Sequence, residues 1–145
     1  MVSARYEVLK DEWKSPADSF SKKVDLEIYY HKGHEYNLDR MMNSMKKSLD
    51  YYSQHFSAYP YQQIRIMEYP RYADFAQSFP GTIPFSEAIG FVLAIEEEKE
   101  VDIPFFITAH ELAHQWWGSQ VVAANVQGRN MILEYLAQYS ALMVL

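Results

Sequence analysis

The sequence predicts a single domain that mixes strands and helices, and three patterns support this. Residues 24–30 and 63–69 alternate apolar and polar side chains, as half-buried strands do. Residues 37–56 carry apolar side chains at helical spacing. The segments 104–117 and 130–145 read as helices that are apolar nearly all round and therefore buried. With 145 residues and 49% hydrophobic content, the chain supports one core and at most one domain.

The first part of the chain predicts two strands. Residues 1–13 alternate weakly and predict a strand, and residues 24–30 predict a second one with a clearer alternation. His31 and His34 lie in the turn that follows. Two histidines three residues apart can bind a metal, but no acidic or thiol partner stands in this pattern. We therefore expect both side chains to be solvated.

A helix and a third strand follow. Asn37 or Asp39 is the expected N-cap of the helix, and residues 63–69 form the next strand by alternation. A stripe of helical residues is expected in the core: Met41, Met42, Met45, Leu49, Tyr52 and Phe56.

The segment before the last two helices is aromatic and punctuated by proline and glycine. Residues 70–84 predict a long loop that either forms the wall of a pocket or covers the sheet. Residues 85–95 predict an edge segment followed by a strand. The next helix is framed by Asp102 as its N-cap, Pro104 in its first turn and Gly118 after its end.

His110, Glu111 and His114 form a His-Glu-x-x-His pattern inside this helix. Side chains at positions i and i+4 share one helix face, so both imidazoles can reach one metal ion. Glu111 projects beside that face, where it can act as a general base on a water molecule. The alternative is a pair of core histidines bonded to backbone carbonyls. We disfavour it because two histidines occur at this spacing with Glu111 between them.

Glu134 is the predicted third metal ligand. A catalytic zinc site needs three protein ligands and one open position, and Glu134 is the only acidic residue after Glu111. A carboxylate buried in an apolar helix needs a cation nearby. The alternative is a glutamate exposed at the helix start, where it complements the helix dipole. Gln138, one turn later, is a weaker prediction for a residue that supports a ligand.

The stretch HELAHQWWG, residues 110–118, followed by a downstream glutamate, resembles the aminopeptidase N family of zinc peptidases, the gluzincins. The spacing from His114 to Glu134 is one residue longer than the usual family pattern. Residues 133–136 read Leu-Glu-Tyr-Leu where the family usually has Asn-Glu-Gly-Phe. The segment 124–143 is similar to a divergent bacterial branch, in which the peptidase domain is fused to membrane-spanning segments of an ABC-transporter-type permease.

This resemblance implies an α+β fold: the thermolysin-like N-terminal half of a metallopeptidase catalytic domain, with the zinc-binding helix packed on a small mixed β-sheet. The chain 1–145 is then expected to be one partial catalytic domain, truncated at its C-terminal end inside an apolar helix. It also implies Zn²⁺ held by His110, His114 and Glu134. The expected partners are a peptide with a free N-terminus and the missing C-terminal part of the same protein.

Glu87 is a candidate for substrate binding because of the same resemblance. Glu87 and Gly90 keep the Glu-x-x-Gly spacing of a family motif whose glutamate binds the free amino group of the substrate. A carboxylate is a suitable partner for an ammonium group. The alternative, a glutamate exposed on a loop without function, stays equally open at this point.

The predicted function is zinc-dependent peptide hydrolysis, as an aminopeptidase, with Glu111 as general base. We expect the isolated chain to bind zinc and to hydrolyse little, because the family's oxyanion-binding tyrosine and C-terminal helical domain lie further downstream. The alternative function is a non-catalytic, zinc-stabilised interaction or regulatory domain of a transporter-associated membrane protein. A metal-free packing domain is the least favoured reading.

Composition sets further limits. The net charge of −6 and the absence of a basic stripe argue against nucleic-acid binding. There is no cysteine, so no disulfide or thiolate zinc site is possible. No stretch of the sequence is long and apolar enough to span a membrane. For the full-length protein, the resemblance implies an association with a bacterial membrane.

Overall fold

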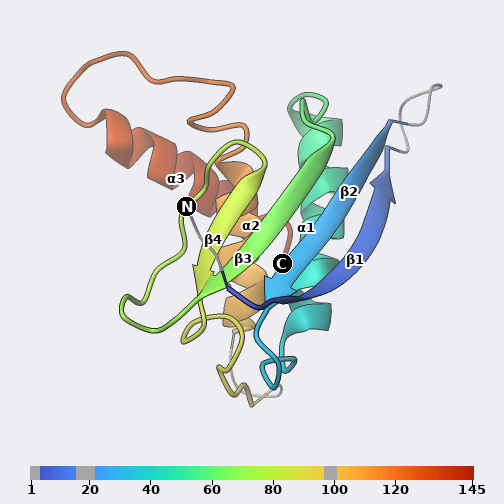
Figure 1. Ribbon diagram of the computed structural model, residues 1–145. Helices are drawn as coiled ribbons and strands as arrows, with labels where there is room; N and C mark the ends of the chain where they lie inside the picture. The colour runs from blue at the N-terminus through green and yellow to red at the C-terminus, as the bar shows by residue number, and fades with distance from the viewer. Residues whose placement is uncertain (1–3, 16–21, 97–100) are drawn as a thin grey trace.

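The computed structural model describes residues 4–15, 22–96 and 101–145, and within them the fold is α+β (Figure 1). The described strands are β1 (Glu7–Lys14), β2 (Lys23–Tyr30), β3 (Gln63–Tyr69) and β4 (Thr82–Ser86). The described helices are α1 (Leu38–His55), α2 (Ile103–Ala113) and α3 (Arg129–Leu142). The first three residues of the strand predicted over 1–13 lie outside the described part of the chain.

The four strands form one mixed sheet in the order of the sequence, β1-β2-β3-β4. β1 runs antiparallel to β2, whereas β2, β3 and β4 are parallel to one another. Parallel neighbours need a crossover connection, and α1 provides it between β2 and β3. α1 and α2 lie on the same face of the sheet (Figure 1). The expected arrangement of a small mixed sheet covered by the His-Glu-x-x-His helix is therefore present.

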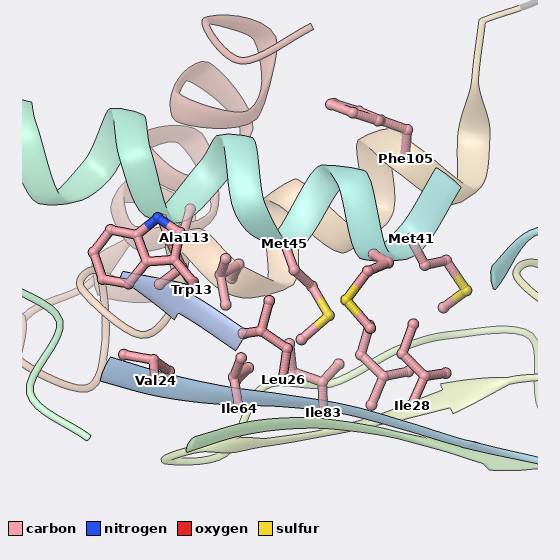
Figure 2. Packing of buried hydrophobic residues seen from close by; sticks show 14 of the residues in the cluster. Trp13, Val24, Leu26, Ile28, Met41, Met45, Ile64, Ile83, Phe105 and Ala113 are labelled. Atoms are coloured by element: carbon pink, nitrogen blue, oxygen red, sulfur yellow. The ribbon is translucent and has the colours of Figure 1, made fainter. Parts of the chain in front are cut away.

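The core lies between this face and the helices. Val24, Leu26 and Ile28 of β2 are completely buried, and the residues between them are exposed or half-buried. The side chains of Leu26 and Ile28 point toward Met45 and Met41 of α1, and Val24 lies below Trp13 (Figure 2). Burying an aliphatic side chain of this size contributes about 1.5–3 kcal/mol. The predicted stripe on α1 is confirmed except at its last member, because Phe56 is exposed.

Two buried hydrogen bonds fix α2 along α1. The Ser44 hydroxyl donates to the backbone carbonyl of Phe105 at 2.7 Å, and the Tyr52 hydroxyl donates to that of Ala109 at 2.9 Å. The start of α2 is capped as predicted, because the Asp102 carboxylate accepts a hydrogen bond from the backbone N–H of Phe105 at 3.0 Å. These contacts fix the position of α2 along α1, and with it the position of the residues at the end of α2.

The prediction of an edge segment and strand over 85–95 is wrong. β4 ends at Ser86, and the chain then turns, with the Ser86 carbonyl accepting a hydrogen bond from Gly90 at 3.3 Å. Gly90 packs tightly on the Phe85 ring: a Cβ atom at this position would lie 2.6 Å from Phe85 Cε1. The apolar residues after Gly90 therefore pack in a compact turn instead of extending into a strand.

Asn37 precedes α1 as predicted, but its side chain does not cap the helix. Its amide group donates to the backbone carbonyls of Gly90 and Leu93 at 2.6 and 2.8 Å instead. The side chain is buried, and these two carbonyls of the turn need donors. Gly118, expected directly after α2, lies further along, in a turn with φ +117°, because α2 ends at Ala113.

α3 was predicted to be a buried helix, and this is wrong. Its buried residues are the small ones, Ala137, Ser140 and Ala141, and α3 packs through them along α2. Its large apolar side chains are mostly exposed: Met131, Ile132, Tyr135, Tyr139 and Leu142. A helix that contacts one neighbour buries one stripe, whatever the composition of its other faces. None of the described helices has the length and hydropathy needed to cross a membrane.

Candidate active site

His110, His114 and Glu134 converge on one point, although α2 and α3 are separated by fifteen residues of chain. The Nε2 atoms of the two histidines lie 3.2 Å apart. Glu134 Oε2 lies 3.3 Å from His110 Nε2, and Glu134 Oε1 lies 3.5 Å from His114 Nε2. In a tetrahedral zinc site with metal–ligand bonds of about 2.0–2.1 Å, ligand atoms are about 3.3 Å apart. The three groups therefore fit three corners of such a site.

The hydrogen bonds of His114 support metal binding through Nε2. Its Nδ1 lies 2.9 Å from the backbone carbonyl of Trp117. A carbonyl only accepts, so Nδ1 carries the proton and the lone pair of Nε2 points toward His110 and Glu134. A second ring nitrogen donating to a carbonyl is the usual support of a metal-binding histidine.

His110 favours the neutral form that ligation requires. Burial lowers its pKa, the proximity of His114 lowers it further, and Glu134 and a hydrogen bond with Gln138 partly oppose the shift. Its Nδ1 is buried without a hydrogen-bond partner among the described residues. The weaker prediction that Gln138 supports a ligand thus has a counterpart in its contact with His110.

Glu134 differs from the expectation in its surroundings. We expected a carboxylate buried in an apolar helix, but the side chain is 62% exposed, because the first turns of α3 face outward. The argument from burial was therefore wrong. Even so, the carboxylate faces both histidines, and its exposure leaves the point between the three groups open to solvent and substrate.

Glu111 lies on the inner side of the same helix end. The residue is only 7% exposed. Burial raises the pKa of Glu111 to about 7, the negative charge of Glu134 raises it too, and a hydrogen bond from the Ser78 backbone lowers it. A carboxyl group that titrates near neutral pH can accept and release a proton at low cost.

Glu111, His114 and Glu134 all line a cavity of about 500 Å³. Its opposite wall belongs to the loop before β4, where we had expected either a pocket wall or a cover for the sheet. The lining residues are Ala76, Gln77, Ser78, Pro80, Glu111, His114, Trp117, Gly118, Ser119, Asn130, Leu133 and Glu134. The pocket-wall alternative is thus confirmed for Ala76, Gln77, Ser78 and Pro80.

Gln115 connects the two walls, and the sequence analysis missed it. The side chain is completely buried. Its oxygen accepts a hydrogen bond from the Gly81 backbone at 2.9 Å, and its nitrogen donates to Ser78 Oγ and the Phe79 carbonyl at 2.5 and 2.9 Å. A polar residue within an otherwise apolar segment was the available signal, because a buried amide needs partners.

Glu87 is not brought to this cavity. Gly81, directly before β4, bonds Gln115, the neighbour of His114, whereas Glu87 follows the other end of the strand. Five strand residues span about 17 Å. The Glu87 carboxylate instead accepts a hydrogen bond from the Arg71 backbone at 3.1 Å and lies 3.9 Å from His34 Nδ1. A role in anchoring the α-amino group of a substrate stays a prediction that this geometry does not favour.

His31 and His34 were expected to be solvated, and this is wrong. Their side chains are 29% and 30% exposed, and both contact the carboxylate of Glu68, which is completely buried. Glu68 falls on the same face of β3 as Ile64 and Ile66, so the strand alternation was the signal that it points inward. The described residues thus contain two groups suited to a metal ion: His31, His34 and Glu68, and His110, His114 and Glu134.

None of the known protein-family models matches this chain. A probable aminopeptidase 1 of Sulfurisphaera tokodaii is 36% identical to it over 81 residues, which cover 52% of this chain and 10% of that protein. The crystal structure of Legionella pneumophila aminopeptidase A in complex with aspartic acid shares its fold, with a TM-score of 0.71 and 17% identity. That match covers 97% of this chain and 16% of the other.

Both proteins are several times longer than this chain, which spans 10% of one and 16% of the other. The structural match shows a shared α+β fold. The sequence match is a distant similarity to a small part of a probable aminopeptidase.

Proposed function

We propose that this chain is the metal-binding part of a zinc-dependent metallopeptidase that acts as an aminopeptidase. The observation that carries the proposal is the convergence of His110, His114 and Glu134 at 3.2–3.5 Å, beside a buried Glu111. Two imidazoles and a carboxylate are a ligand set found in catalytic zinc sites. The distant similarity to a probable aminopeptidase supports the same reaction class.

The proposal includes the finer assignment that the resemblance suggests. The fold would be the thermolysin-like N-terminal half of a gluzincin catalytic domain, and the chain would belong to a longer protein. The small share of both relatives that it spans is in keeping with this. The similarity of residues 124–143 to the permease-fused branch is the basis for proposing a membrane-associated bacterial protein.

A bound Zn²⁺ would polarise the scissile carbonyl and lower the pKa of a coordinated water toward neutrality. The residues of this chain would perform the other steps. His110, His114 and Glu134 hold the ion, and the Trp117 carbonyl fixes the ring of His114. Glu111 accepts the proton of the attacking water and passes it to the leaving amine. In the metal-free chain burial raises its pKa to about 7, and a cation beside it would favour the carboxylate form that accepts the proton.

Glu111 also favours a catalytic over a purely structural metal. A structural zinc site is closed by protein ligands and needs no base beside it. Here a fourth protein ligand is absent from the group formed by the described residues, and Glu111 lines the adjoining cavity. A buried carboxylic acid without a catalytic role would be a costly choice at this position.

Zinc content and peptide hydrolysis test the proposal together. Elemental analysis of the 145-residue chain should give one zinc ion fewer per chain in His114→Ala than in the wild type. His55→Ala is the matched control, because His55 is exposed on α1 and bonds only the Tyr51 carbonyl. Glu111→Gln should keep the zinc, yet in the full-length protein it should lower turnover of aminoacyl-anilides about 10²–10⁴-fold.

Each result has a definite meaning. An unchanged zinc content in His114→Ala would contradict the assigned ligands. If His114→Ala loses its zinc but Glu111→Gln keeps full activity, Glu111 is not the general base. Hydrolysis of N-acetylated peptides as fast as free ones would contradict the aminopeptidase assignment and leave an endopeptidase.

A further inference from the structure

Two histidines and a buried glutamate meet at the carboxyl ends of β2 and β3. His31 directly follows β2, His34 lies in the turn toward α1, and Glu68 is the last but one residue of β3. The ends meet because β2 and β3 are parallel, with Tyr29 paired to Met67. This group of side chains lies at the opposite end of the sheet from the hydrogen bond between Gly81, just before β4, and Gln115, just after α2.

The three side chains present their ligand atoms to one another. The Glu68 oxygens face one imidazole each: Oε2 lies 3.3 Å from His31 Nδ1, and Oε1 lies 2.5 Å from His34 Nδ1. All three groups offer ligand atoms within 4.8 Å of one another. The first distance already equals the edge of a tetrahedral zinc site, about 3.3 Å. A bound ion would require the second pair to separate by about 0.8 Å.

The strongest reason to expect a cation between these three side chains is the burial of the Glu68 carboxylate. Its side chain is completely buried, and its ion pairs within the described residues are those with His31 and His34. One further hydrogen bond comes from the His31 backbone N–H at 2.5 Å. An ionised carboxylate in such a place needs positive charge close to it. A divalent cation between the three groups supplies that charge with both imidazoles neutral.

Neighbouring residues support the same arrangement. The Tyr6 ring packs on the His31 ring with centroids 5.0 Å apart, and its hydroxyl donates to the Glu68 backbone carbonyl at 2.7 Å. Glu87 Oε2 lies 3.9 Å from His34 Nδ1. Its other oxygen faces Arg71 Nε at 3.7 Å, so Glu87 would offset only part of the charge that remains on a divalent ion after Glu68 is counted. The partial exposure of both histidines gives the ion a route from solvent.

We propose that His31 Nδ1, His34 Nδ1 and the Glu68 carboxylate form a second site for a divalent transition metal, with zinc as the expected ion. Imidazole and carboxylate ligands together suit zinc better than magnesium or calcium, which prefer oxygen ligands. The site would fasten the turn between β2 and α1 to the end of β3. It is separate from the metal site of α2 and α3 and does not depend on it.

The test uses a background in which the other group is removed. The 145-residue chain carrying His110→Ala and His114→Ala is loaded with Zn²⁺, freed of excess metal and analysed for zinc. About one ion per chain should remain. Adding His31→Ala and His34→Ala should remove it. Adding His55→Ala instead should leave it in place, because His55 contacts neither group.

A spectroscopic measurement distinguishes the two sites. It needs only the background chain, so it remains valid even if the variants with His31→Ala and His34→Ala do not fold. Both histidines of the second site would bind through Nδ1, whereas His110 and His114 face Glu134 through Nε2. In a ¹⁵N spectrum of histidine side chains, adding Zn²⁺ to the background chain should shift the Nδ1 resonances of His31 and His34.

Three outcomes would overturn the proposal. The first is that the background chain takes up no zinc, which would mean that protons alone link the histidines to Glu68. The second is that the chain keeps its zinc after both His31 and His34 are replaced. The third is that the resonances shifted by zinc belong to Nε2 atoms or to His55.

Discussion

The side-chain oxygen of Gln115 accepts a hydrogen bond from the backbone N–H of Gly81 at 2.9 Å, across the boundary between α2 and the loop before β4. Gln115 follows His114 directly, so the residue that supports one wall of the cavity is joined in sequence to a proposed metal ligand. The Gln115 amide thus joins the segment after α2 to the loop that forms the opposite wall of the cavity.

Gln115→Ala should destabilise the chain by about 2–4 kcal/mol. The substitution leaves the Gly81 N–H without its acceptor and removes two further bonds, to Ser78 and Phe79. Urea denaturation measures the loss. The control is Gln54→Ala on the exposed side of α1, expected within about 0.5 kcal/mol of the wild type. Equal effects of the two substitutions would show that the Gln115 network contributes little.

Glu111→Gln should stabilise the metal-free chain, although it should lower the activity of the full-length protein. The folded state holds the pKa of Glu111 at about 7, above its ordinary value of 4.5, so the folded chain binds more protons than the unfolded chain between these pH values. The contribution of Glu111 to stability therefore falls as pH rises from about 4.5 to 7. Above pH 7, where the whole pKa shift counts, the loss in the free energy of unfolding is about 3 kcal/mol.

Urea unfolding in the presence of a chelator checks this prediction between pH 5 and pH 8. The difference between wild type and Glu111→Gln isolates Glu111, because other groups, including His110, titrate in both chains. The variant should gain stability relative to the wild type as pH rises. A constant difference across this range would mean that Glu111 does not titrate there.

Removing the metal should loosen α3 and leave α1 unchanged. α3 buries only small residues and is held besides by a hydrogen bond from Trp117 Nε1 to Ser140 Oγ, so in the proposed site a metal shared by Glu134 and α2 would add a large part of what holds it. Hydrogen exchange with and without chelator should show faster exchange over residues 129–142 and little change over 38–55. In Glu134→Ala, the chelator should not change hydrogen exchange over residues 129–142. If exchange in α3 of this variant still depends on zinc, a contact other than Glu134 couples the helix to the metal.

Gly90→Ala should destabilise the chain by about 1–3 kcal/mol, because a methyl group at this position meets the buried Phe85 ring at 2.6 Å. Thermal unfolding measures the loss. The same substitution in a Phe85→Leu background should cost less, since the smaller side chain makes room for the methyl group. Additive costs would show that the loss at Gly90 has another origin than the contact with Phe85.

The sequence predicted best what depends on short spacing. His110, Glu111 and His114 lie within one turn and a half of a helix, so their relative positions follow from helix geometry alone. The strands 24–30 and 63–69 were found for the same reason, because alternation is local.

Contacts between distant segments were harder to predict. Glu68 is thirty-four residues from His34, and only the three-dimensional pairing of β2 with β3 brings them together. Glu134 was predicted as the only acidic residue after Glu111, and the supporting argument that it is buried was wrong; its position comes from the docking of α3 on α2. For Glu87, motif spacing indicated a role, but the direction of β4 carries it away from the cavity.

The strands lie in the sheet in the order in which the ribosome makes them. Each new strand can pair with the one synthesised just before it, so the sheet can grow as the chain emerges. Glu68 completes one group of metal-binding side chains before α2 exists, and Glu134 completes the other only near the end of the described chain. If both groups take up zinc, the ion at the sheet can be acquired during synthesis, and the ion beside Glu111 must arrive last.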